Sequence, residues 1–517
     1  MSIRTALSAA ALTVLLGGSA LAQSAAYTTP HYAVETGDAA VSFEGKAYVN
    51  HGLVGVGRLA ASTRDFNGET LGSFSSMALR SWRRLKDGSY EGDIVTLPDR
   101  GPNDVGSVKG TTDYQNRLHA LHVTLKPYVG SAPVDADQTQ LKITPTGGMI
   151  LKDETGAPFT GMDPGTGIID RGQIRYPSPQ SGPGAGHISL DSEGVAYLPD
   201  GSFYVSDEYA PGLYLFDKTG KQTGAIQTVP ALLPMTDGKL NFNAGKPPTT
   251  GRRNNQGFEA VAVSPDGRRL ITILQSAAMQ DTSGSDAATR NNTRILVYDI
   301  SKTRTPTAPI GDYVLQLPVY TEKGDGKAPD ATAAQSEMAA LSQTRFLVLS
   351  RDSNGRGKGA PNAPVFKSVL LVDLAGATNL VGTPYDRGTE AVAKGGQLVA
   401  GITPVKQAEL VNLLNPTQLG KFGMNLKVTP STLYTLPEKL EAMALAPVLD
   451  PKAPNDFFLF VGNDNDFQTA HGRVAGQDFD AGLKNEKGSG TGDNENILLV
   501  YRLTLPDYAP AAVARTR

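Results

Sequence analysis

The sequence contains no cysteine and only one tryptophan among its 517 residues. The lack of cysteine excludes disulfide bonds, thiolate catalysis and cysteine-ligated zinc sites. The sequence has only six histidines, and it lacks the His-Glu-x-x-His pattern of zinc hydrolases and the Gly-x-Ser-x-Gly turn of α/β-hydrolases. A chain of this composition has to obtain its rigidity from core packing or from hard cations, which bind oxygen ligands.

An excess of positive charge is also absent. The chain has 48 Lys and Arg against 51 Asp and Glu, which gives a formal net charge of −3. No basic stripe stands out, and this speaks against binding to nucleic acid or to an anionic membrane surface. Beyond the N-terminus, no apolar run reaches the roughly 18 residues that a membrane-spanning helix needs. We therefore expect no nucleic-acid partner and no membrane span.

The N-terminus has the layout of a secretory signal peptide. Arg4 precedes an apolar run over residues 6–16, and Ala20-Leu21-Ala22 supplies a small-residue cleavage site. The pattern predicts cleavage after Ala22 and an exported protein, either periplasmic or secreted. The expected organisation is a signal peptide over residues 1–22, an N-terminal extension over 23–45, a single domain over 46–505 and a flexible C-terminal tail over 506–517.

Glycine and proline are abundant, with 57 and 34 residues, and they separate many short strand-like runs. One pattern of three such runs recurs five times along the chain. Four copies begin with a run that carries a glutamate, and the fifth has serine at that place. The copies are SEGVAY (192–197), FEAVAV (258–263), SEMAAL (336–341), LEAMAL (440–445) and SSMAL (75–79). Repeated antiparallel strands of this kind predict an all-β fold of the β-propeller type.

The expected architecture is one β-propeller with loop and short helical insertions. Five blades are visible as repeats, and a sixth is expected. The sixth blade is either degenerate or closed by a strand near residues 47–59 that joins the last repeat. Five or seven blades are the alternatives, and a β-sandwich with chance similarity is the competing fold. Residues 406–421, rich in alanine and leucine, are expected to be helical.

Acidic residues at the strand ends are expected to converge. In an antiparallel hairpin the start of the first strand lies beside the end of the second, so Glu193 should lie near Asp207 and Glu208. The first strands of propeller blades line the central channel and point the same way. The sequence therefore predicts a ring at one mouth of the channel. Its members are Glu193, Glu259, Glu337 and Glu441, with Asp99, Asp207, Glu208, Asp352, Asp464 and Asp466 around them.

Such a ring cannot remain fully ionised without compensation. Two like charges about 4 Å apart cost roughly 4 kcal/mol at an effective dielectric constant near 20. The acids are then protonated, or paired with arginine and backbone amides, or bound to cations. Arg100 and Arg351 adjoin two of the acids and cancel part of the charge. Oxygen ligands without histidine or cysteine favour Ca²⁺, which we expect as the cofactor. The expected ligands are Glu193, Glu259, Glu337, Glu441, Asp99, Asp207, Asp352 and Asp464.

Longer motifs are more specific than the repeated glutamates. They include LPDRGPN (97–103), TDYQNRLH (112–119), FTGMDP (159–164), EGVAYLPDGSFYVSDEYAPGLYLFDKTGK (193–221) and NQGFEAVAVSPDG (255–267). Together with SEMAAL, LSRD and LEAMAL they span about residues 70 to 503. They resemble the phytase-like domain family, "esterase-like activity of phytase", a group of secreted bacterial β-propeller proteins. The resemblance implies a calcium-dependent propeller with phosphoesterase or esterase activity.

The resemblance also implies which positions are functional. They are Asp99, Arg100, Glu193, Asp207, Glu208, Glu259, Glu337, Asp352 and Glu441. The sequence departs from the expected pattern at two places. The stretch between Asp163 and Glu193 is expanded, and Gln275 stands where other repeats end in an acid.

Three functional hypotheses follow. The first is a metal-dependent hydrolase of a small phosphoester or ester, with Asp207 or Glu208 as the base. Arg100 and Arg351 would then bind the substrate, and Arg100 would stabilise the developing charge. The second is a non-catalytic, calcium-stabilised propeller that binds a glycan, a peptide or an envelope partner. The third is a lactone hydrolase similar to gluconolactonases. The sequence leaves the oligomeric state open.

Overall fold

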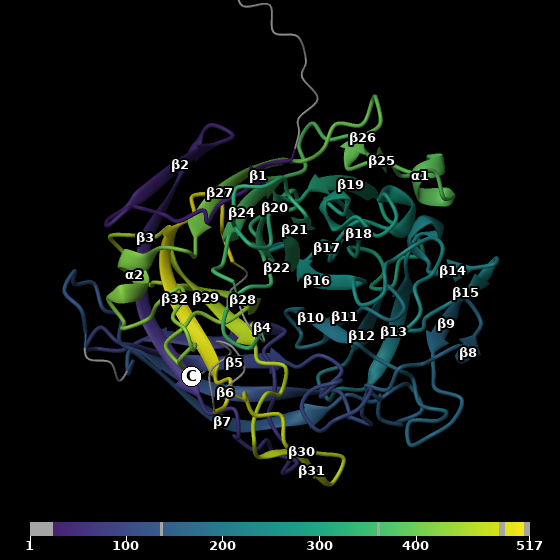
Figure 1. The fold of residues 1–517 in the computed structure, drawn as a ribbon, viewed down its shortest axis with the longest axis horizontal. Coiled ribbons are helices and arrows are strands. Elements are labelled where there is room, and N and C mark those ends of the chain that lie inside the picture. Colours follow the sequence, from purple (N-terminus) through teal and green to yellow (C-terminus); the bar gives the residue numbers. More distant parts are fainter. Residues whose placement is uncertain (1–23, 135–137, 359–361, 485–491, 511–517) are drawn as a thin grey trace, which may run out of the picture.

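The computed structural model describes residues 24–134, 138–358, 362–484 and 492–510. The predicted signal peptide and residues 511–517 of the predicted tail lie outside these ranges. The described chain is all-β, as predicted, and its helices are short (Figure 1). These are α1 (Pro384–Arg387), α2 (Pro416–Gly420), η1 (Pro230–Leu232), η2 (Met279–Asp281) and η3 (Ala287–Thr289). None of the helices in this part of the chain is long and apolar enough to cross a membrane.

Five sheets of four or five strands form most of the fold. The first sheet contains β4 (Ser76–Arg84), β5 (Tyr90–Leu97), β6 (Arg117–Leu125) and β7 (Leu141–Ile150). The second contains β10 (Ser192–Tyr197), β11 (Phe203–Asp207), β12 (Gly212–Phe216) and β13 (Gln222–Gln227). The third contains β16 (Phe258–Val263), β17 (Arg269–Leu274), β18 (Asn292–Asp299) and β19 (Gly311–Gln316).

The fourth sheet contains β22 (Ala334–Ala340), β23 (Arg345–Arg351), β24 (Lys367–Asp373) and β27 (Lys406–Asn412). The fifth has the order β2 (Ala39–Phe43), β3 (Lys46–Leu59), β32 (Asn496–Thr504), β29 (Asp456–Asp464) and β28 (Lys439–Pro447). All neighbours within these five sheets pair antiparallel.

Several small sheets lie in the segments that connect the strands of the large sheets. They are β8 (Ile168–Arg171) with β9 (Ile174–Pro177), β14 (Met235–Thr236) with β15 (Lys239–Leu240), β25 (Ala393–Lys394) with β26 (Gln397–Leu398), and β30 (Gly472–Val474) with β31 (Gln477–Phe479). A three-stranded sheet joins β1 (Ala26–Tyr27), β20 (Val319–Tyr320) and β21 (Ala331–Thr332). The predicted N-terminal extension therefore contains two strands, β1 and β2, that pair with the rest of the chain.

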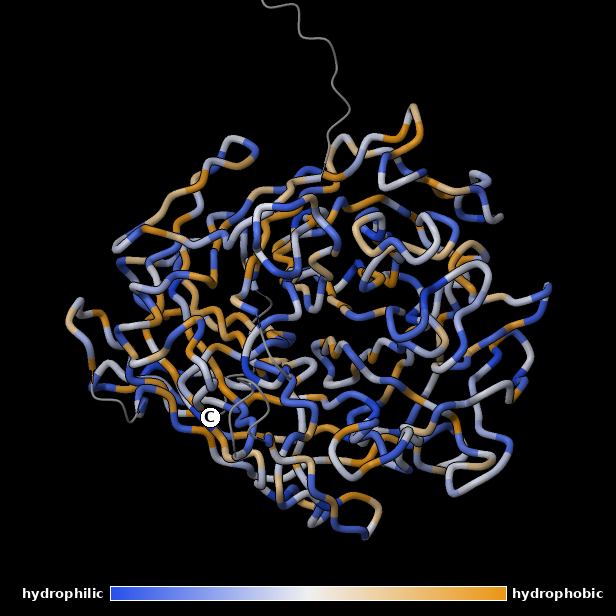
Figure 2. Tube along the Cα trace, viewed as in Figure 1, coloured by the Kyte–Doolittle hydropathy of each residue, from blue (hydrophilic) through white to orange (hydrophobic). Residues whose placement is uncertain are grey.

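Apolar packing covers both faces of each large sheet. Many strands, such as LITIL in β17 and FLVLS in β23, are apolar almost throughout, because a sheet buried on both faces does not alternate. Five apolar clusters lie between consecutive sheets, and one of them joins the fifth sheet to the first through Phe458, Phe460, Ile94 and Leu121. Figure 2 shows hydrophobic stretches mainly along the sheets and hydrophilic ones mainly in the loops.

The first strands of the repeats surround the centre of the molecule. β10 lies against β4 and β16, β22 lies against β16 and β28, and β28 lies against β4 (Figure 1). Residues far apart in the sequence therefore meet where these strands begin. This arrangement positions the site described below.

The N-terminal strand does not create a sixth sheet. β3 pairs antiparallel with β32, with Val56 opposite Leu499, so the N-terminus completes the sheet of the last repeat. The predicted joining of a strand near residues 47–59 to the last repeat is confirmed, but β3 extends an existing sheet between β2 and β32, and the described residues contain five large sheets. The helix predicted over residues 406–421 is also corrected: residues 406–412 form β27, and only α2 is helical.

The packing of β3 against β7 predicts an effect of Gly57→Ala. A Cβ atom at Gly57 would overlap the backbone oxygen of Leu141, and the backbone would have to shift. Overpacking of this kind costs about 1–3 kcal/mol. We expect a lower melting temperature in a thermal melt. Gly37→Ala is the matched control, because its Cβ would have no neighbour within 4 Å. Equal melting temperatures for the two variants would contradict this account.

Candidate functional site

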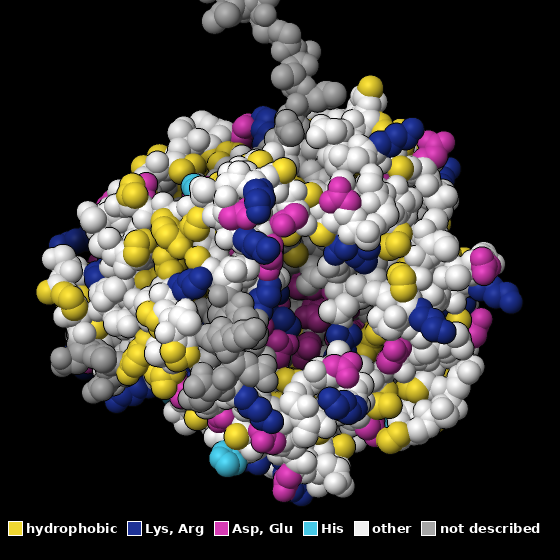
Figure 3. All heavy atoms as spheres, viewed as in Figure 1, with side chains coloured by type: hydrophobic (Ala, Val, Ile, Leu, Met, Phe, Trp, Pro, Cys, Tyr) yellow, Lys and Arg dark blue, Asp and Glu magenta, His cyan; other side chains and the backbone are white. Residues whose placement is uncertain are grey.

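A cavity of about 510 Å³ opens where the first strands begin. Figure 3 shows the hollow near the centre of the face, with acidic side chains inside it and basic ones beside them. The acidic residues in its lining are Asp99, Glu193, Glu208, Glu259, Glu441, Asp464 and Asp466. The basic residues are Arg100, Arg290, Arg351 and Lys439. Acidic side chains are in excess, and the cavity is negative when all of them are ionised.

β-Bulges turn several of these glutamates into the cavity. The antiparallel register shifts at Glu259, between Phe258 and Ala260, and at Glu441, between Leu440 and Ala442. A similar irregularity contains Glu193, at the start of β10. A bulged residue is unpaired in the ladder, and its side chain is re-aimed relative to the regular alternation of the strand. The repeated Glu-x-x-Ala pattern therefore marks bulges as well as strand starts.

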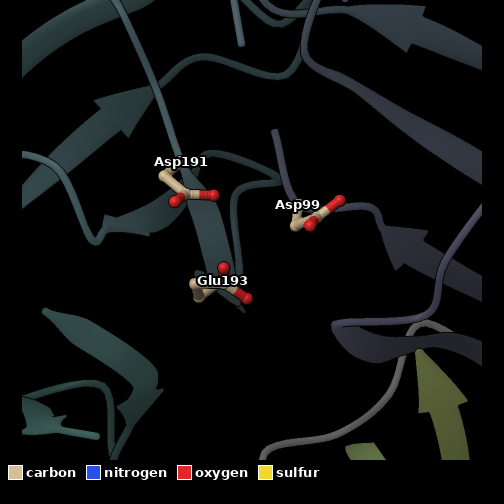
Figure 4. A group of neighbouring side chains, drawn as sticks. All are labelled: Asp99, Asp191 and Glu193. Atoms are coloured by element: carbon tan, nitrogen blue, oxygen red, sulfur yellow. The ribbon is translucent and has the colours of Figure 1, made fainter. Parts of the chain in front are cut away.

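Two groups of carboxylates converge in the cavity. Asp99, Asp191 and Glu193 form the first, called here the Asp191 group. Glu193, Glu208 and Glu259 form the second, called here the Glu259 group. Within each group, one oxygen atom of every side chain lies within 4.8 Å of the others. Figure 4 shows the Asp191 group, in which Asp99 comes from a different segment of the chain than Asp191 and Glu193. Glu193 belongs to both groups.

Apart from Asp191, which pairs with Arg100, the acids of these two groups form no ion pair with a described residue. Burial and the neighbouring carboxylates raise the pKa values of Asp99, Glu193 and Glu259 well above their usual range. Burial raises the pKa of Glu208 to about 8. Oε1 of Glu259 accepts a hydrogen bond from Nε2 of Gln275 at 2.7 Å, whereas its buried Oε2 receives none from the described residues. Gln275, the departure noted in the sequence, thus serves this group.

The chemistry of the ligand atoms determines which cation these residues can bind. The two groups offer only carboxylate oxygens, and the buried Oε2 of Glu259 has no donor among the described residues. Hard cations such as Ca²⁺ take several oxygen ligands in flexible geometry. The residues present therefore fit Ca²⁺.

Asp191 and the acids outside the two groups pair with basic side chains of the protein. Nη1 of Arg100 donates to Oδ2 of Asp191 at 2.6 Å. Arg351 pairs with Glu441. Nζ of Lys439 lies 3.0 Å from Oδ2 of Asp464 and 2.5 Å from Oδ1 of Asp466. Glu441 and Asp464, predicted as metal ligands, and Arg100 and Arg351, predicted to bind substrate, are thus engaged in ion pairs with side chains of the chain itself.

Asp207 lies outside the cavity lining. Its Oδ1 accepts the backbone N–H groups of Asp191 and Tyr209, and its Oδ2 accepts from Ala210 and the Tyr214 hydroxyl, at 3.0 to 3.1 Å. Burial raises the pKa of Asp207 to about 7 against these hydrogen bonds, which lower it. These hydrogen bonds indicate a structural role for Asp207, which fixes the loop after β11 to the start of β10.

Asp352 is similarly enclosed. Its carboxylate accepts backbone N–H groups of Asn354, Val365 and Phe366 and pairs with Nζ of the fully buried Lys367 at 2.8 Å. The structure does not bring it to either carboxylate group, although the sequence predicted it among the metal ligands.

Glu337 follows the bulge of its strand, whereas Glu259 and Glu441 occupy the bulge itself. In β22 the bulge lies at Ser336, and Glu337 pairs directly with Leu349. Its carboxylate accepts from the Ser76 hydroxyl of β4 and from the backbone N–H of Met338, and burial raises its pKa well above its usual range. A shift of one residue turns a side chain to the opposite face of a strand. Glu337 therefore lies away from the cavity, unlike Glu193 and Glu259.

The sequence prediction did not include three charged residues of this site. Asp191 lies two residues before Glu193, a spacing that places side chains on the same face of an extended segment, and this signal was available. Lys439 and Arg290 carried no such signal, because nothing local distinguishes them from exposed basic residues. They reach the cavity only because neighbouring sheets pack together.

Comparisons with known proteins agree with the resemblance seen in the sequence. Residues 70–467 match the phytase-like family, described as "Esterase-like activity of phytase". A protein of Arthroderma benhamiae named "Uncharacterized secreted protein" is 34% identical over 464 residues, which cover 82% of this chain and 88% of that protein.

Matches to solved structures are weak. A chain from "COPII on membranes, outer coat vertex" is 10% identical, with 92% of this chain and 83% of that chain covered and a TM-score of 0.27. The "Major Malassezia sympodialis Allergen Mala s 1" is 9% identical, with 90% and 88% covered and a TM-score of 0.28. Likenesses at these TM-scores support no conclusion. The family match spans most of the sequence, and the chain belongs to the phytase-like family.

Proposed function

We propose that this protein is an exported, calcium-dependent hydrolase of phosphoric or carboxylic esters, built on a five-bladed β-propeller. Five sheets whose first strands surround the centre support the propeller. The secretory pattern of residues 1–22 and the printed name of the Arthroderma benhamiae relative support export. The description of the family supports ester hydrolysis.

One observation carries the proposal: Glu193 belongs to both carboxylate groups, and of their five residues only Asp191 forms an ion pair with a described residue. Like charges this close are unfavourable in a buried site unless cations or protons offset them. Asp99, Asp191, Glu193 and Glu259 would hold Ca²⁺, with Glu193 common to both groups and Glu208 beside the ion. When bound, Ca²⁺ would polarise the oxygen of the ester and stabilise the charge that develops on it.

Glu208 is proposed as the general base. The backbone N–H of Gly257 donates to its Oε1 at 3.1 Å and orients the carboxylate, which lines the cavity. Burial raises its pKa to about 8, and a nearby Ca²⁺ would favour the ionised form that accepts a proton. Glu208 would accept a proton from the attacking water. Asp207, the other base predicted from the sequence, is not proposed, because hydrogen bonds from its own loop surround its carboxylate.

Arg100 is proposed as a positioning residue rather than a substrate ligand. Its guanidinium pairs with Asp191 and also donates to the side chain of Asn255. The backbone N–H of Arg100 lies 3.3 Å from Oδ1 of Asp191. These contacts hold the orientation of one carboxylate of the Asp191 group.

A substrate panel tests the proposal. Purified protein is assayed with p-nitrophenyl phosphate, phytate and p-nitrophenyl acetate, with calcium or with a chelator. We expect calcium-dependent turnover, and we expect Glu208→Gln to lower kcat by at least about 100-fold, the range of general-base catalysis. Glutamine keeps the acceptor for Gly257, so the fold should be retained. Bound calcium without turnover of any ester would favour a non-catalytic binding protein, and turnover of lactones alone would favour a lactonase.

A further inference from the structure

A second cavity is lined by the same first strands as the carboxylate cavity. It has a volume of about 300 Å³, and β4, β10, β16, β22 and β28 all contribute to its lining. The carboxylate cavity opens where these strands begin, whereas this one is lined by residues further along them, and the two share no lining residue. Pockets for small molecules have volumes from about 300 Å³ upward. The cavity, called here the Arg80 cavity, is therefore large enough for a small ligand.

The lining of the Arg80 cavity is apolar except at one end. Met77, Met338 and Met443 contribute to it from three different strands, and each is at most 3% exposed. Methionine side chains are flexible, and they adapt to apolar ligands of irregular shape. Arg80 is the one charged side chain in the lining that the described residues form. An apolar pocket with a single fixed charge favours a ligand that has an apolar body and a charged end.

A β-bulge determines the position of Arg80. In β10, β16, β22 and β28 the pairing register shifts near the start of the strand, beside the carboxylate cavity. In β4 it shifts further along, between Leu79 and Ser81, and Arg80 is the residue left out of the ladder. Bulges re-aim side chains and are frequent next to functional sites. Cζ of Arg80 lies over the ring of Tyr197, 3.6 Å from its centroid, and this contact holds the guanidinium at the cavity.

Arg80 has no acidic partner. Within the described chain it forms neither an ion pair nor a hydrogen bond, and its contact with the aromatic ring is the interaction recorded for it. The acids of the nearby turns have partners of their own. Asp200 pairs with Arg304 at 2.8 Å, and Asp266 accepts a hydrogen bond from the side chain of Gln343. A free guanidinium offers a carboxylate two parallel N–H donors in a planar geometry that matches it.

We propose that the Arg80 cavity binds an amphiphilic carboxylate, namely a free, unbranched aliphatic acid of medium chain length. Its carboxylate would pair with Arg80, and its chain would lie among Met77, Met338 and Met443, where each buried methylene adds to the affinity. The hydrogen bond from Ser76 to Glu337 joins β4 and β22 between the parts of β22 that line the two cavities. The ligand would therefore bind apart from the carboxylate groups, and the inference goes beyond the proposed ester hydrolysis.

The first test separates the charge from the apolar chain. Sodium octanoate and 1-octanol are titrated calorimetrically into full-length wild type, Arg80→Gln and Arg84→Gln. We expect saturable binding of octanoate to wild type and at least about tenfold weaker binding to Arg80→Gln, because a charge-assisted hydrogen bond is lost. Binding of 1-octanol should differ by less than about twofold between these two proteins, which also shows that the variant is folded.

Arg84→Gln is the matched control for this test. Arg84 belongs to the same strand and is exposed, and it does not line the cavity. Its replacement should leave the affinity for octanoate within about twofold of wild type. Absence of saturable octanoate binding to wild type, or an equal loss in Arg80→Gln and Arg84→Gln, would overturn the proposal.

The second test locates the ligand. In protein labelled with ¹³C at the methionine methyl groups, octanoate should shift the signals of Met77, Met338 and Met443. The signals of Met149 and Met424, which do not line the cavity, should stay in place. Shifts at these two methionines without shifts at the first three would overturn the assignment.

A shortened chain tests the competing occupant. Tyr508 and Pro510 also line the Arg80 cavity, and residues 511–517 follow them in the sequence. A variant that ends at Pro510 should bind octanoate within about twofold of wild type, since the Arg80 pairing is retained. An increase in affinity of about tenfold or more would identify the C-terminal segment of the chain as the occupant and would overturn the proposal.

Discussion

Glu193→Gln is expected to remove bound calcium and to abolish ester hydrolysis, whereas Glu337→Gln should leave both unchanged. Glu193 is the one side chain common to both carboxylate groups, and its carboxylate makes no hydrogen bond to a described residue. A neutral amide there removes a ligand from both groups at once. Changes in residues that only support a metal ligand already cost about 10–100-fold in affinity. We expect a loss of at least about 100-fold in calcium affinity, and a comparable or larger loss in kcat/KM.

The Glu337 variant is a sharp control because the sequence treats the two glutamates alike. Both occupy the same place in the repeated pattern, and both are buried. Burial raises the pKa of Glu337 well above its usual range, so glutamine resembles the protonated acid that is already favoured there. Calcium is counted by metal analysis of dialysed protein, and turnover is measured with p-nitrophenyl phosphate.

Three outcomes are informative for this pair of variants. Loss of calcium in Glu193→Gln alone would support the two carboxylate groups. Equal losses in both variants would support the symmetric ring that the repeats predicted. Retention of calcium in Glu193→Gln would contradict both accounts. Thermal melts in calcium-free buffer exclude misfolding, because removing one of several repelling carboxylates should not destabilise the metal-free fold.

Calcium-free protein is expected to lose stability as the pH rises from 5 to 8, and saturating calcium should suppress most of this loss. The folded-state pKa of Glu208 is raised from 4.5 to about 8 by burial. A group with a raised folded-state pKa stabilises the fold fully below its unfolded value, and this contribution disappears as the pH rises through the folded value. The window for Glu208 therefore runs from about pH 4.5 to about pH 8.

The expected effect is large. One pKa unit corresponds to 1.36 kcal/mol, so Glu208 alone contributes on the order of 5 kcal/mol across this window. The raised pKa values of Glu193 and Glu259 act in the same direction. Bound calcium favours the ionised carboxylates, which removes the reason for their protonation. Calcium should therefore stabilise the protein more at pH 8 than at pH 5.

Melting temperatures at pH 5, 6, 7 and 8, with and without calcium, measure this effect. Glu208→Gln is the control, because it lacks one of the titrating groups and should show a flatter pH dependence in calcium-free buffer. Parallel curves with and without calcium would contradict the assignment of these carboxylates to a cation site.

Much of the architecture could be predicted from local sequence patterns. The recurrence of Glu-x-x-Ala runs before further apolar strands predicted the all-β fold, and the described residues confirm it. The same recurrence placed Glu193 near Glu208 and Glu259, and these three side chains lie in one group. The pairing of strands within a hairpin depends on residues that are close in the sequence. A repeated sequence pattern therefore reveals both this pairing and the common direction of the first strands.

Other features depended on the register and packing of distant segments. The bulge in β22 lies one residue earlier than in the other repeats, and this turns Glu337 toward Ser76. The residues of SEMAAL do not allow the position of the bulge to be predicted. Both predicted substrate ligands, Arg100 and Arg351, proved to be ion-paired, with Asp191 and Glu441 respectively. Such pairings are chosen in three dimensions, from side chains that are 91 and 90 positions apart in the sequence.

The sequence by itself determined the strand repeats, the oxygen-rich ligand chemistry and membership of the phytase-like family, because these reside in local residue order. Only the tertiary structure decided which acids remain without a partner. It paired Glu441 with Arg351 and placed Lys439 between Asp464 and Asp466, and it left Glu193, Glu208 and Glu259 together. Whether a carboxylate is compensated depends on all the charged groups around it in space. Those groups come from different sheets of the fold.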